Sequence, residues 1–131
     1  MLDRFKVPEE DKVYVPVEKI TKVTENILKS SGVSEDGAKN STSVLIGNDL
    51  RGVETHGVSN GLRLYVEKYA SGQYNSSPDI KIVRESATTA TIDGDNGLGA
   101  EIGPLAMDMA IEKAEKYGMG CVVVSLSLIH I

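Results

Sequence analysis

The spacing of apolar residues changes once along this chain, and that change limits the folds open to it. Over residues 15–72 apolar side chains recur at helical spacing. A loop rich in turn-forming residues follows over 73–78, and then two short stretches alternate apolar and polar side chains, as strands do. The sequence therefore predicts an α+β protein. It would have an extended arm over residues 1–14, a helical segment over 15–72 and a β-β-α-β segment over 73–124.

The helical segment is expected to hold three helices. The first carries an apolar stripe to about Ser30, and the second begins after Ser34, a residue type that caps helices well. The second helix should end near Leu50, and the first two should pack as a helical hairpin. Ser59 is the predicted N-cap of the third helix.

The rest of the chain alternates strand and helix patterns. Ile80–Arg84 and Thr88–Asp93 are predicted to form a β-hairpin, and Ala100–Tyr117 a long helix. The apolar run Cys121–Val124 predicts a buried strand, which would make Cys121 a structural thiol and not a nucleophile.

Composition excludes several classes of protein. A net charge of -5, with 25% charged and 40% apolar residues, is typical of a soluble globular protein and argues against a nucleic-acid or anionic-membrane partner. A single cysteine excludes an internal disulfide and fits a reducing compartment. No apolar run reaches membrane-spanning length, so a cytosolic location is expected.

The glycine-rich stretch Gly97-x-Gly99-x-x-x-Gly103 follows a strand pattern and precedes a helix, as dinucleotide-binding loops do. Its spacing is one residue longer than the usual fingerprint, and two acids, Asp93 and Asp95, precede it. A calcium loop is also disfavoured, because the sixth-position glycine and the twelfth-position glutamate are missing. A tight turn that packs the helix against the sheet is the better prediction.

The segment from Arg51 to Arg63 holds the main candidate for chemistry. Its His56 is followed at once by Gly57, and a glycine beside an imidazole allows another backbone or a ligand to approach closely. An unperturbed imidazole titrates near neutrality and therefore suits proton transfer. The alternative is a histidine that only makes hydrogen bonds within a turn between two helices.

Two polar side chains on the third predicted helix could join this histidine. Asn60 and Arg63 stand three residues apart and share a helix face, so an imidazole, an amide and a guanidinium could converge on one cavity. The planar guanidinium of Arg63 would suit a carboxylate. Alternatively, Arg63 pairs with Glu67, four residues on, as an exposed couple.

Taken together, these motifs resemble the N-terminal part of the malate/L-lactate dehydrogenase family, whose fold is unrelated to that of the Rossmann lactate and malate dehydrogenases. The family includes nicotinamide-dependent enzymes acting on ureidoglycolate, sulfolactate and diketogulonate. The resemblance covers roughly Val15 to Val124. It is carried by the stretches Gly32-Val33-Ser34-x-x-x-Ala38, Asp49 to Val58, Tyr65 to Gly72, Ile92 to Gly99, and Ala106-Met107-x-x-Ala110-Ile111-x-x-Ala114.

The resemblance implies roles for individual residues. His56 matches the family's motif histidine, to which proton transfer with the substrate is assigned. Thr55 stands where many members have serine. Threonine keeps the hydroxyl group, so Thr55 is expected to take part in substrate binding. Asn60 stands where members commonly carry an arginine that is expected to bind the substrate carboxylate, and Arg63, one turn on, is the proposed substitute. The resemblance also implies NAD or NADP as cofactor, a 2-hydroxy or 2-keto acid as substrate, and a homodimer.

Family members are much longer than this chain, and a second histidine motif is expected just after Val124. The chain instead ends with residues 125–131, and Leu126 to Ile131 is similar to a translated sequencing adapter. This tail is therefore expected to be non-native, so His130 is not given the role of the second histidine. Most of the nicotinamide-binding surface would then lie outside the chain, and the chain alone is expected to be inactive.

Two readings from other functional classes stay open on the sequence. One is a non-catalytic module that binds a small acid through His56, Asn60 and Arg63, and the other is a structural or interaction domain. The surroundings of His56 distinguish them, because a catalytic residue needs an open side that faces a cavity, whereas a structural histidine would be buried and fully hydrogen-bonded.

Overall fold

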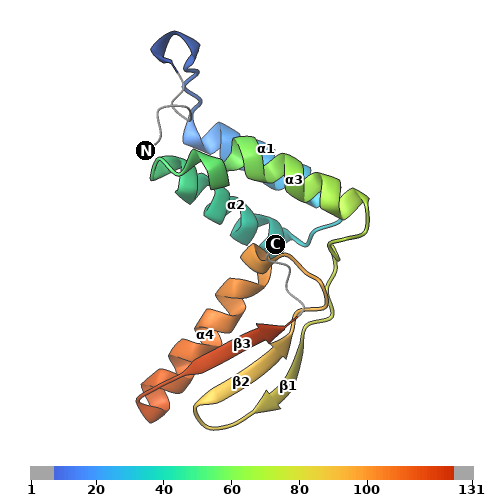
Figure 1. The fold of residues 1–131 in the computed structure, drawn as a ribbon, viewed down its shortest axis with the longest axis vertical. Helices are drawn as coiled ribbons and strands as arrows, with labels where there is room; N and C mark the ends of the chain where they lie inside the picture. The colour runs from blue at the N-terminus through green and yellow to red at the C-terminus, as the bar shows by residue number, and fades with distance from the viewer. Residues whose placement is uncertain (1–7, 126–131) are drawn as a thin grey trace.

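The computed structural model describes residues 8–125, which form a helical part and a sheet part that meet end to end (Figure 1). The helical part contains α1 (Val17–Ser30), α2 (Glu35–Leu50) and α3 (Val58–Ala70). The sheet part contains β1 (Lys81–Glu85), β2 (Thr89–Asp93), α4 (Gly99–Tyr117) and β3 (Cys121–Ser125). There are also two single 3-10 turns, η2 (Glu9–Asp11) and η3 (Glu54–His56). The predicted α+β class, with helices first and then β-β-α-β, is confirmed.

Local signals determine where α1 ends and α2 begins. Gly32 adopts a positive φ of 92°, which favours glycine, and it turns the chain after α1. The Ser34 hydroxyl then accepts a hydrogen bond from the Gly37 amide at 3.1 Å, so Ser34 caps α2 as predicted. The two helices pack against each other as the expected hairpin.

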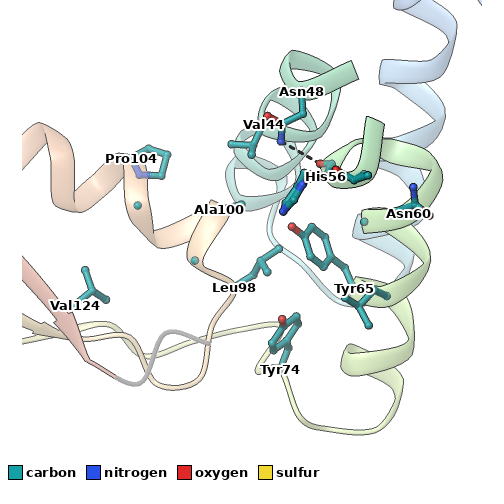
Figure 2. Close-up of a pocket in the computed structure, with 15 residues that line it drawn as sticks. Val44, Asn48, His56, Asn60, Tyr65, Tyr74, Leu98, Ala100, Pro104 and Val124 are labelled. Atoms are coloured by element: carbon teal, nitrogen blue, oxygen red, sulfur yellow. Dashed lines mark hydrogen bonds between the residues drawn. The ribbon is translucent and has the colours of Figure 1, made fainter. Parts of the chain in front are cut away.

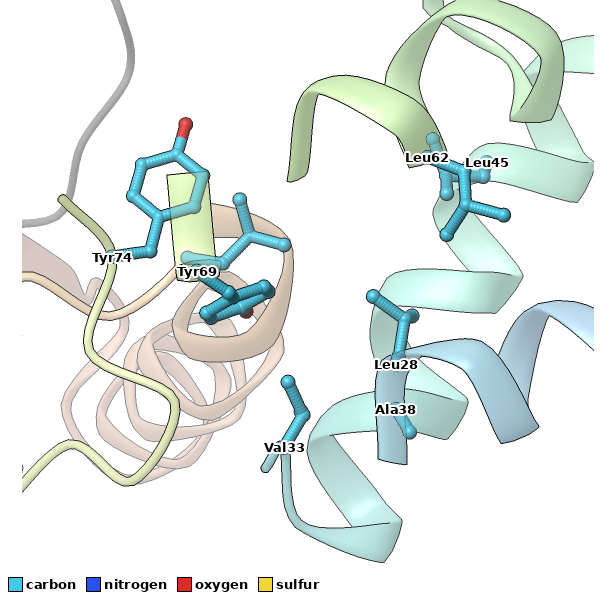
Figure 3. Close-up of a cluster of buried hydrophobic side chains, with 8 residues drawn as sticks. Leu28, Val33, Ala38, Leu45, Leu62, Tyr69 and Tyr74 are labelled. Carbon is cyan, nitrogen blue, oxygen red and sulfur yellow. The ribbon is translucent and has the colours of Figure 1, made fainter. Parts of the chain in front are cut away.

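The hydrophobic core lies where α1, α2 and α3 meet and extends toward the start of α4 (Figure 3). Leu28 and Leu45 are completely buried in it, and Tyr69 and Tyr74 pack edge to face with ring centroids 5.6 Å apart. The full cluster consists of Leu28, Val33, Ala38, Leu45, Leu62, Tyr69, Tyr74 and Leu98.

The start of α3 differs from the prediction. Ser59 does not cap this helix, because α3 begins at Val58 and its N-cap is Gly57, two residues before the predicted cap. A glycine has no side chain that could cap. Instead, Asp49 near the end of α2 accepts the hydrogen bond of the Val58 amide at 2.9 Å. The cap therefore comes from a residue that is distant along the chain.

The sheet has the strand order β1-β2-β3. β1 and β2 form the predicted antiparallel hairpin, with an irregularity between Ile82 and Arg84, whereas β3 lies parallel to β2 and is reached through α4. The chain packs closely on α4 where it enters β3. A Cβ on Gly120 would lie 1.9 Å from the Ala110 carbonyl oxygen, so a side chain there would keep β3 away from α4.

The prediction that Cys121–Val124 is a buried strand is wrong. Cys121 is exposed, and Val123 keeps 56% of its surface accessible. β3 lies at the edge of the sheet, and α4 packs on the sheet face that carries the buried Ala90 and Ile92. Alternate residues of β3 point to the opposite face and stay accessible.

The glycine-rich stretch forms the predicted tight turn between β2 and α4. Asp95 and Asn96 both adopt positive φ, and the Gly97 amide donates to the Gly94 carbonyl at 2.8 Å. A Cβ on Gly97 would lie 2.8 Å from the Pro78 ring, so the turn packs closely on the preceding loop.

Over the described residues, no helix is both long and apolar enough to cross a membrane. The predicted arm is covered only from residue 8, where the chain is exposed and forms the single turn η2. The tail predicted to be non-native lies outside the described residues, except for Ser125, which ends β3.

Candidate functional site

The turn that carries His56 joins the end of α2 to the start of α3, and α2 holds it by hydrogen bonds. After α2, Gly52 adopts a positive φ of 74° and reverses the chain into η3. The Asn48 side chain donates to the His56 carbonyl oxygen at 3.0 Å, and the Val53 amide donates to the Asn48 carbonyl at 2.9 Å. Asn48 therefore fixes the turn at both ends.

The next residue of α2, Asp49, holds the other side of the same turn. Its carboxylate accepts the Val58 amide hydrogen, which is a charge-assisted bond at the positive end of α3. The carboxylate lies so close to Gly57 that a Cβ there would be 1.5 Å from Asp49 Oδ1. The glycine after His56 is thus required by this close approach, not by an unusual φ, since its φ is -90°.

The imidazole of His56 is oriented by its neighbour. The Thr55 hydroxyl lies 2.9 Å from His56 Nδ1. A hydroxyl can donate to a neutral ring nitrogen or accept from a protonated one, so this contact is compatible with both charge states of the ring. The side chain of His56 is exposed, and Nε2 has no hydrogen-bond partner among residues 8–125. Nε2 is therefore free to meet a ligand.

His56 lines a cavity of about 810 Å³, here called the His56 pocket, between α2, α3 and the start of α4 (Figure 2). Figure 2 shows Ala100 and Pro104 on one side, Asn60 on the other and the His56 ring between them. Most of the lining is apolar. The pocket is lined by Val44, Asn48, Thr55, His56, Asn60, Gly61, Leu64, Tyr65, Tyr74, Leu98, Gly99, Ala100, Gly103, Pro104 and Val124.

The first turns of α4 form the wall across from His56. Pro104 stands inside this helix and has no N–H, so the Ala100 carbonyl lacks its usual helical donor. Ala100 and Pro104 both line the His56 pocket. This wall therefore offers small or apolar surface and a backbone carbonyl without its usual helical partner.

Of the residues predicted to form the site, the structure brings together Thr55, His56 and Asn60. All three line the His56 pocket, and the Asn60 amide donates to the Glu54 carbonyl at 3.2 Å. Arg63 does not line it. Its Nε donates to Glu67 Oε1 at 2.8 Å, and the arginine side chain is 84% exposed. Arg63 therefore forms the exposed ion pair with Glu67 that was the alternative prediction.

Three residues of this region were not assigned a site role from the sequence. Asn48 and Asp49 lie on α2, eight and seven positions before His56, and no local spacing indicates that they hold the turn. Tyr65 enters the sequence analysis only as the first residue of a stretch that carries the family resemblance, yet it lines the His56 pocket. Burial and the neighbouring Tyr74 raise the pKa of Tyr65, so its phenol stays protonated and can donate a hydrogen bond.

The pocket residues carry little formal charge. Within the described chain, no lysine or arginine lines the His56 pocket. The pocket can therefore orient a small polar group through His56, Thr55 and Asn60 and bury an apolar ring against Leu98 and Leu64. Among residues 8–125 it is lined by no permanently charged cation for a phosphate or a carboxylate.

We expect Gly57→Ala to lower the free energy of unfolding by about 1.5–3 kcal/mol, the value of a hydrogen bond to a charged group, because the new Cβ would displace Asp49 from Val58. Urea unfolding of the chain measures this. Gly47→Ala is the matched control on α2: its Cβ would meet nothing within 4 Å, so it should stabilise by about 0.5–1 kcal/mol. Equal effects of the two substitutions would contradict the close approach at Gly57.

Comparison with known proteins identifies the family. The profile of the malate/L-lactate dehydrogenase family matches residues 15–130. The malate dehydrogenase of Pyrococcus abyssi is 42% identical over 116 residues, which are 88% of this chain and 32% of that protein. The L-sulfolactate dehydrogenase of Methanocaldococcus jannaschii is 44% identical over 97 residues, 74% of this chain and 28% of that protein.

The fold agrees with this similarity. The solved structure of the malate dehydrogenase from Pyrococcus horikoshii superposes with a TM-score of 0.88 at 38% identity, covering 97% of this chain and 36% of that one. The chain thus spans about a third of the length of the relatives it matches. Sequence and fold agree along almost the whole described chain, and the chain belongs to the malate/L-lactate dehydrogenase family.

Proposed function

We propose that this chain forms the N-terminal part of an NAD(P)-dependent oxidoreductase that interconverts a small 2-hydroxy acid and its 2-keto acid, with His56 transferring the proton. The observation that carries the proposal is the His56 ring, which is held at Nδ1 by Thr55 and left free at Nε2 on a cavity. Relatives named malate, sulfolactate and ureidoglycolate dehydrogenases support the substrate class. A purely structural histidine would be walled in, and this one is exposed.

In the proposed reaction Nε2 of His56 is the atom that exchanges a proton with the substrate oxygen. During oxidation the neutral ring accepts the proton of the 2-hydroxyl group, and during reduction the imidazolium returns a proton to the carbonyl oxygen. In the neutral tautomer that can accept a proton at Nε2, Nδ1 carries the ring hydrogen and donates it to the Thr55 hydroxyl, and this bond is kept when the ring becomes an imidazolium. The Asn60 amide, which lines the same pocket, is proposed to orient the substrate.

The pocket fits the nicotinamide end of the cofactor better than its phosphates. Leu64, Leu98 and Pro104 provide apolar surface on which a flat ring could rest. When bound, NAD or NADP would supply the hydride acceptor or donor. The lining residues include no lysine or arginine in the described chain, so the diphosphate finds no cationic partner in the His56 pocket.

The substrate carboxylate also needs a partner, and Arg63 is the proposed one. An exposed pair such as Arg63–Glu67 is screened by water and contributes little to stability, so releasing the guanidinium costs little. A bidentate bond to a carboxylate in a less hydrated pocket would be stronger. The role requires Arg63 to turn away from Glu67 toward the neighbouring side of α3.

The proposal further includes a homodimeric, cytosolic parent protein. Met107 and Ile111 stand one turn apart on α4 and are 60% and 48% exposed. Apolar side chains of this kind are typical of surfaces that other protein segments cover. Size-exclusion chromatography of the complete protein measures the oligomeric state.

We expect the 131-residue chain alone to show no hydride transfer and to bind NAD⁺ or NADP⁺ more weakly than about 1 mM, because its pocket supplies no cation for the diphosphate. Isothermal titration calorimetry and nicotinamide absorbance with malate, lactate or sulfolactate measure both. Turnover by the chain alone would overturn this part of the proposal.

In a protein that carries the complete reading frame, His56→Gln should lower kcat by about 10²–10⁴-fold, the usual contribution of a positioned general acid or base. Steady-state kinetics with 2-hydroxy acids and both cofactors measures the effect. Thr55→Ser keeps the hydroxyl next to Nδ1 and should retain most of the activity. A His56→Gln protein with the kcat of the parent would contradict the proton-transfer role.

Arg63→Ala in the same complete protein should raise KM by about tenfold or more while changing kcat less, because a charged hydrogen bond to the substrate contributes about 1.5–3 kcal/mol. Glu67→Gln is the control, since it releases Arg63 from its present partner and should not raise KM. If KM is unchanged in Arg63→Ala, Arg63 does not bind the carboxylate.

A further inference from the structure

A carboxylate from α4 is inserted into the first turn of α2, at the junction of the helical part and the sheet part. Glu101 lies in the first turn of α4, and Gly37 lies in the first turn of α2. A Cβ on Gly37 would be 2.2 Å from Glu101 Oε1 and 2.6 Å from its carboxyl carbon. The missing side chain of Gly37 therefore provides the space that Glu101 occupies.

The surroundings of Glu101 are partly favourable to a negative charge. The carboxylate stands beside the starts of two helices, α2 and α4, whose unpaired amides carry partial positive charge. Burial is the larger effect on the pKa of Glu101 and raises it, whereas the nearby Ser34 side chain lowers it. Oε2 is buried and has no hydrogen-bond partner within the described chain.

The same junction includes Tyr69 from α3. Its hydroxyl is buried and lacks a hydrogen-bond partner among residues 8–125, and the charge of Glu101 contributes, after burial, to raising the Tyr69 pKa. A buried carboxylate oxygen without a partner is costly, so hydrophobic packing alone would favour a different residue here. This cost suggests that the contact has another role, which is to hold α4 in its position.

We propose that Glu101 is a positioning residue, whose carboxylate, seated in the gap at Gly37, holds the first turns of α4 in place as the wall of the pocket opposite His56. Gly99 and Ala100 precede Glu101, Gly103 and Pro104 follow it, and all four line the pocket, whereas Glu101 contacts α2. The contact thereby sets the spacing between the His56 turn and this wall. The catalytic consequence rests on the proposed function, but the structural coupling does not.

A double-mutant cycle on the chain tests the contact. Gly37→Ala alone should lower the ratio of folded to unfolded protein about threefold or more, because its Cβ must displace the end of the Glu101 side chain from its seat. In a Glu101→Ala background the same change should lower the ratio less than about threefold, since the next atom, Ser34 Oγ, would be 3.0 Å away. Equal effects in the two backgrounds would refute the seating of Glu101 at Gly37.

A distance measurement tests the positioning role separately from stability. The exposed Cys121 on β3 and a Ser59→Cys substitution on α3 would carry spin labels, and electron double resonance would report the distance between the two parts. Glu101→Ala should broaden the distance distribution or shift it to longer values. Glu101→Gln keeps the shape and an acceptor for Ser34, so it should resemble the parent, as should the exposed α4 control Glu112→Ala.

An unchanged distribution in Glu101→Ala would overturn the positioning role even if the protein were less stable. In the complete protein, Glu101→Ala should raise KM about threefold or more with a smaller effect on kcat, because His56 and Thr55 are untouched. If the proposed reaction were wrong, turnover would be absent in parent and variants alike, while the distance change would still be observed. The two proposals therefore fail separately.

Discussion

The arrangement of the candidate site depends on the bond between the Asp49 carboxylate and the Val58 amide. α3 begins at a glycine that has no side chain to cap the helix, and Asp49 supplies the acceptor from the end of α2. Because Val58 is only two residues from His56, the bond that caps α3 also fixes the backbone of the histidine. Asn48 adds a second restraint at the His56 carbonyl. The ring can therefore be exposed while its backbone is held on both sides.

A feature of this fold can be predicted when the residues that determine it lie close together in the sequence. The helix–helix turn at Gly32 and Ser34, the hairpin and the long helix follow from periodicity, caps and turn residues within a few positions, and all are found where the sequence predicts them. The start of α3 was misplaced because its cap comes from Asp49, nine residues before Val58. The strand Cys121–Val124 was predicted to be buried because an apolar run does not indicate whether one or both faces of a sheet are covered.

The same distinction applies to the candidate site. Thr55 and His56 are adjacent, and Asn60 is one helical turn from His56, so their meeting at one pocket is a local consequence of the sequence. The side of α3 that faces the pocket, by contrast, is not determined by neighbouring residues in the sequence. It is set by the packing of α3 on α2, where Gly61 lies so close to Leu45 that a Cβ would be 2.6 Å from Leu45 Cδ2. This packing turns Gly61, Leu64 and Tyr65 toward the pocket and leaves Arg63 with Glu67.

The distribution of charge separates two tasks that the proposed reaction requires. The His56 pocket contains a group that can exchange a proton and an apolar wall, but within the described residues it is lined by no cation for an anionic substrate. A guanidinium fixed beside the imidazole would disfavour the protonated ring that reduction requires. In the proposed reaction, the weak surface pair of Arg63 with Glu67 would avoid that repulsion until a carboxylate arrives to neutralise the guanidinium. In this scheme the anionic substrate itself brings Arg63 to the site, so recognition of its charge and protonation of His56 do not oppose each other.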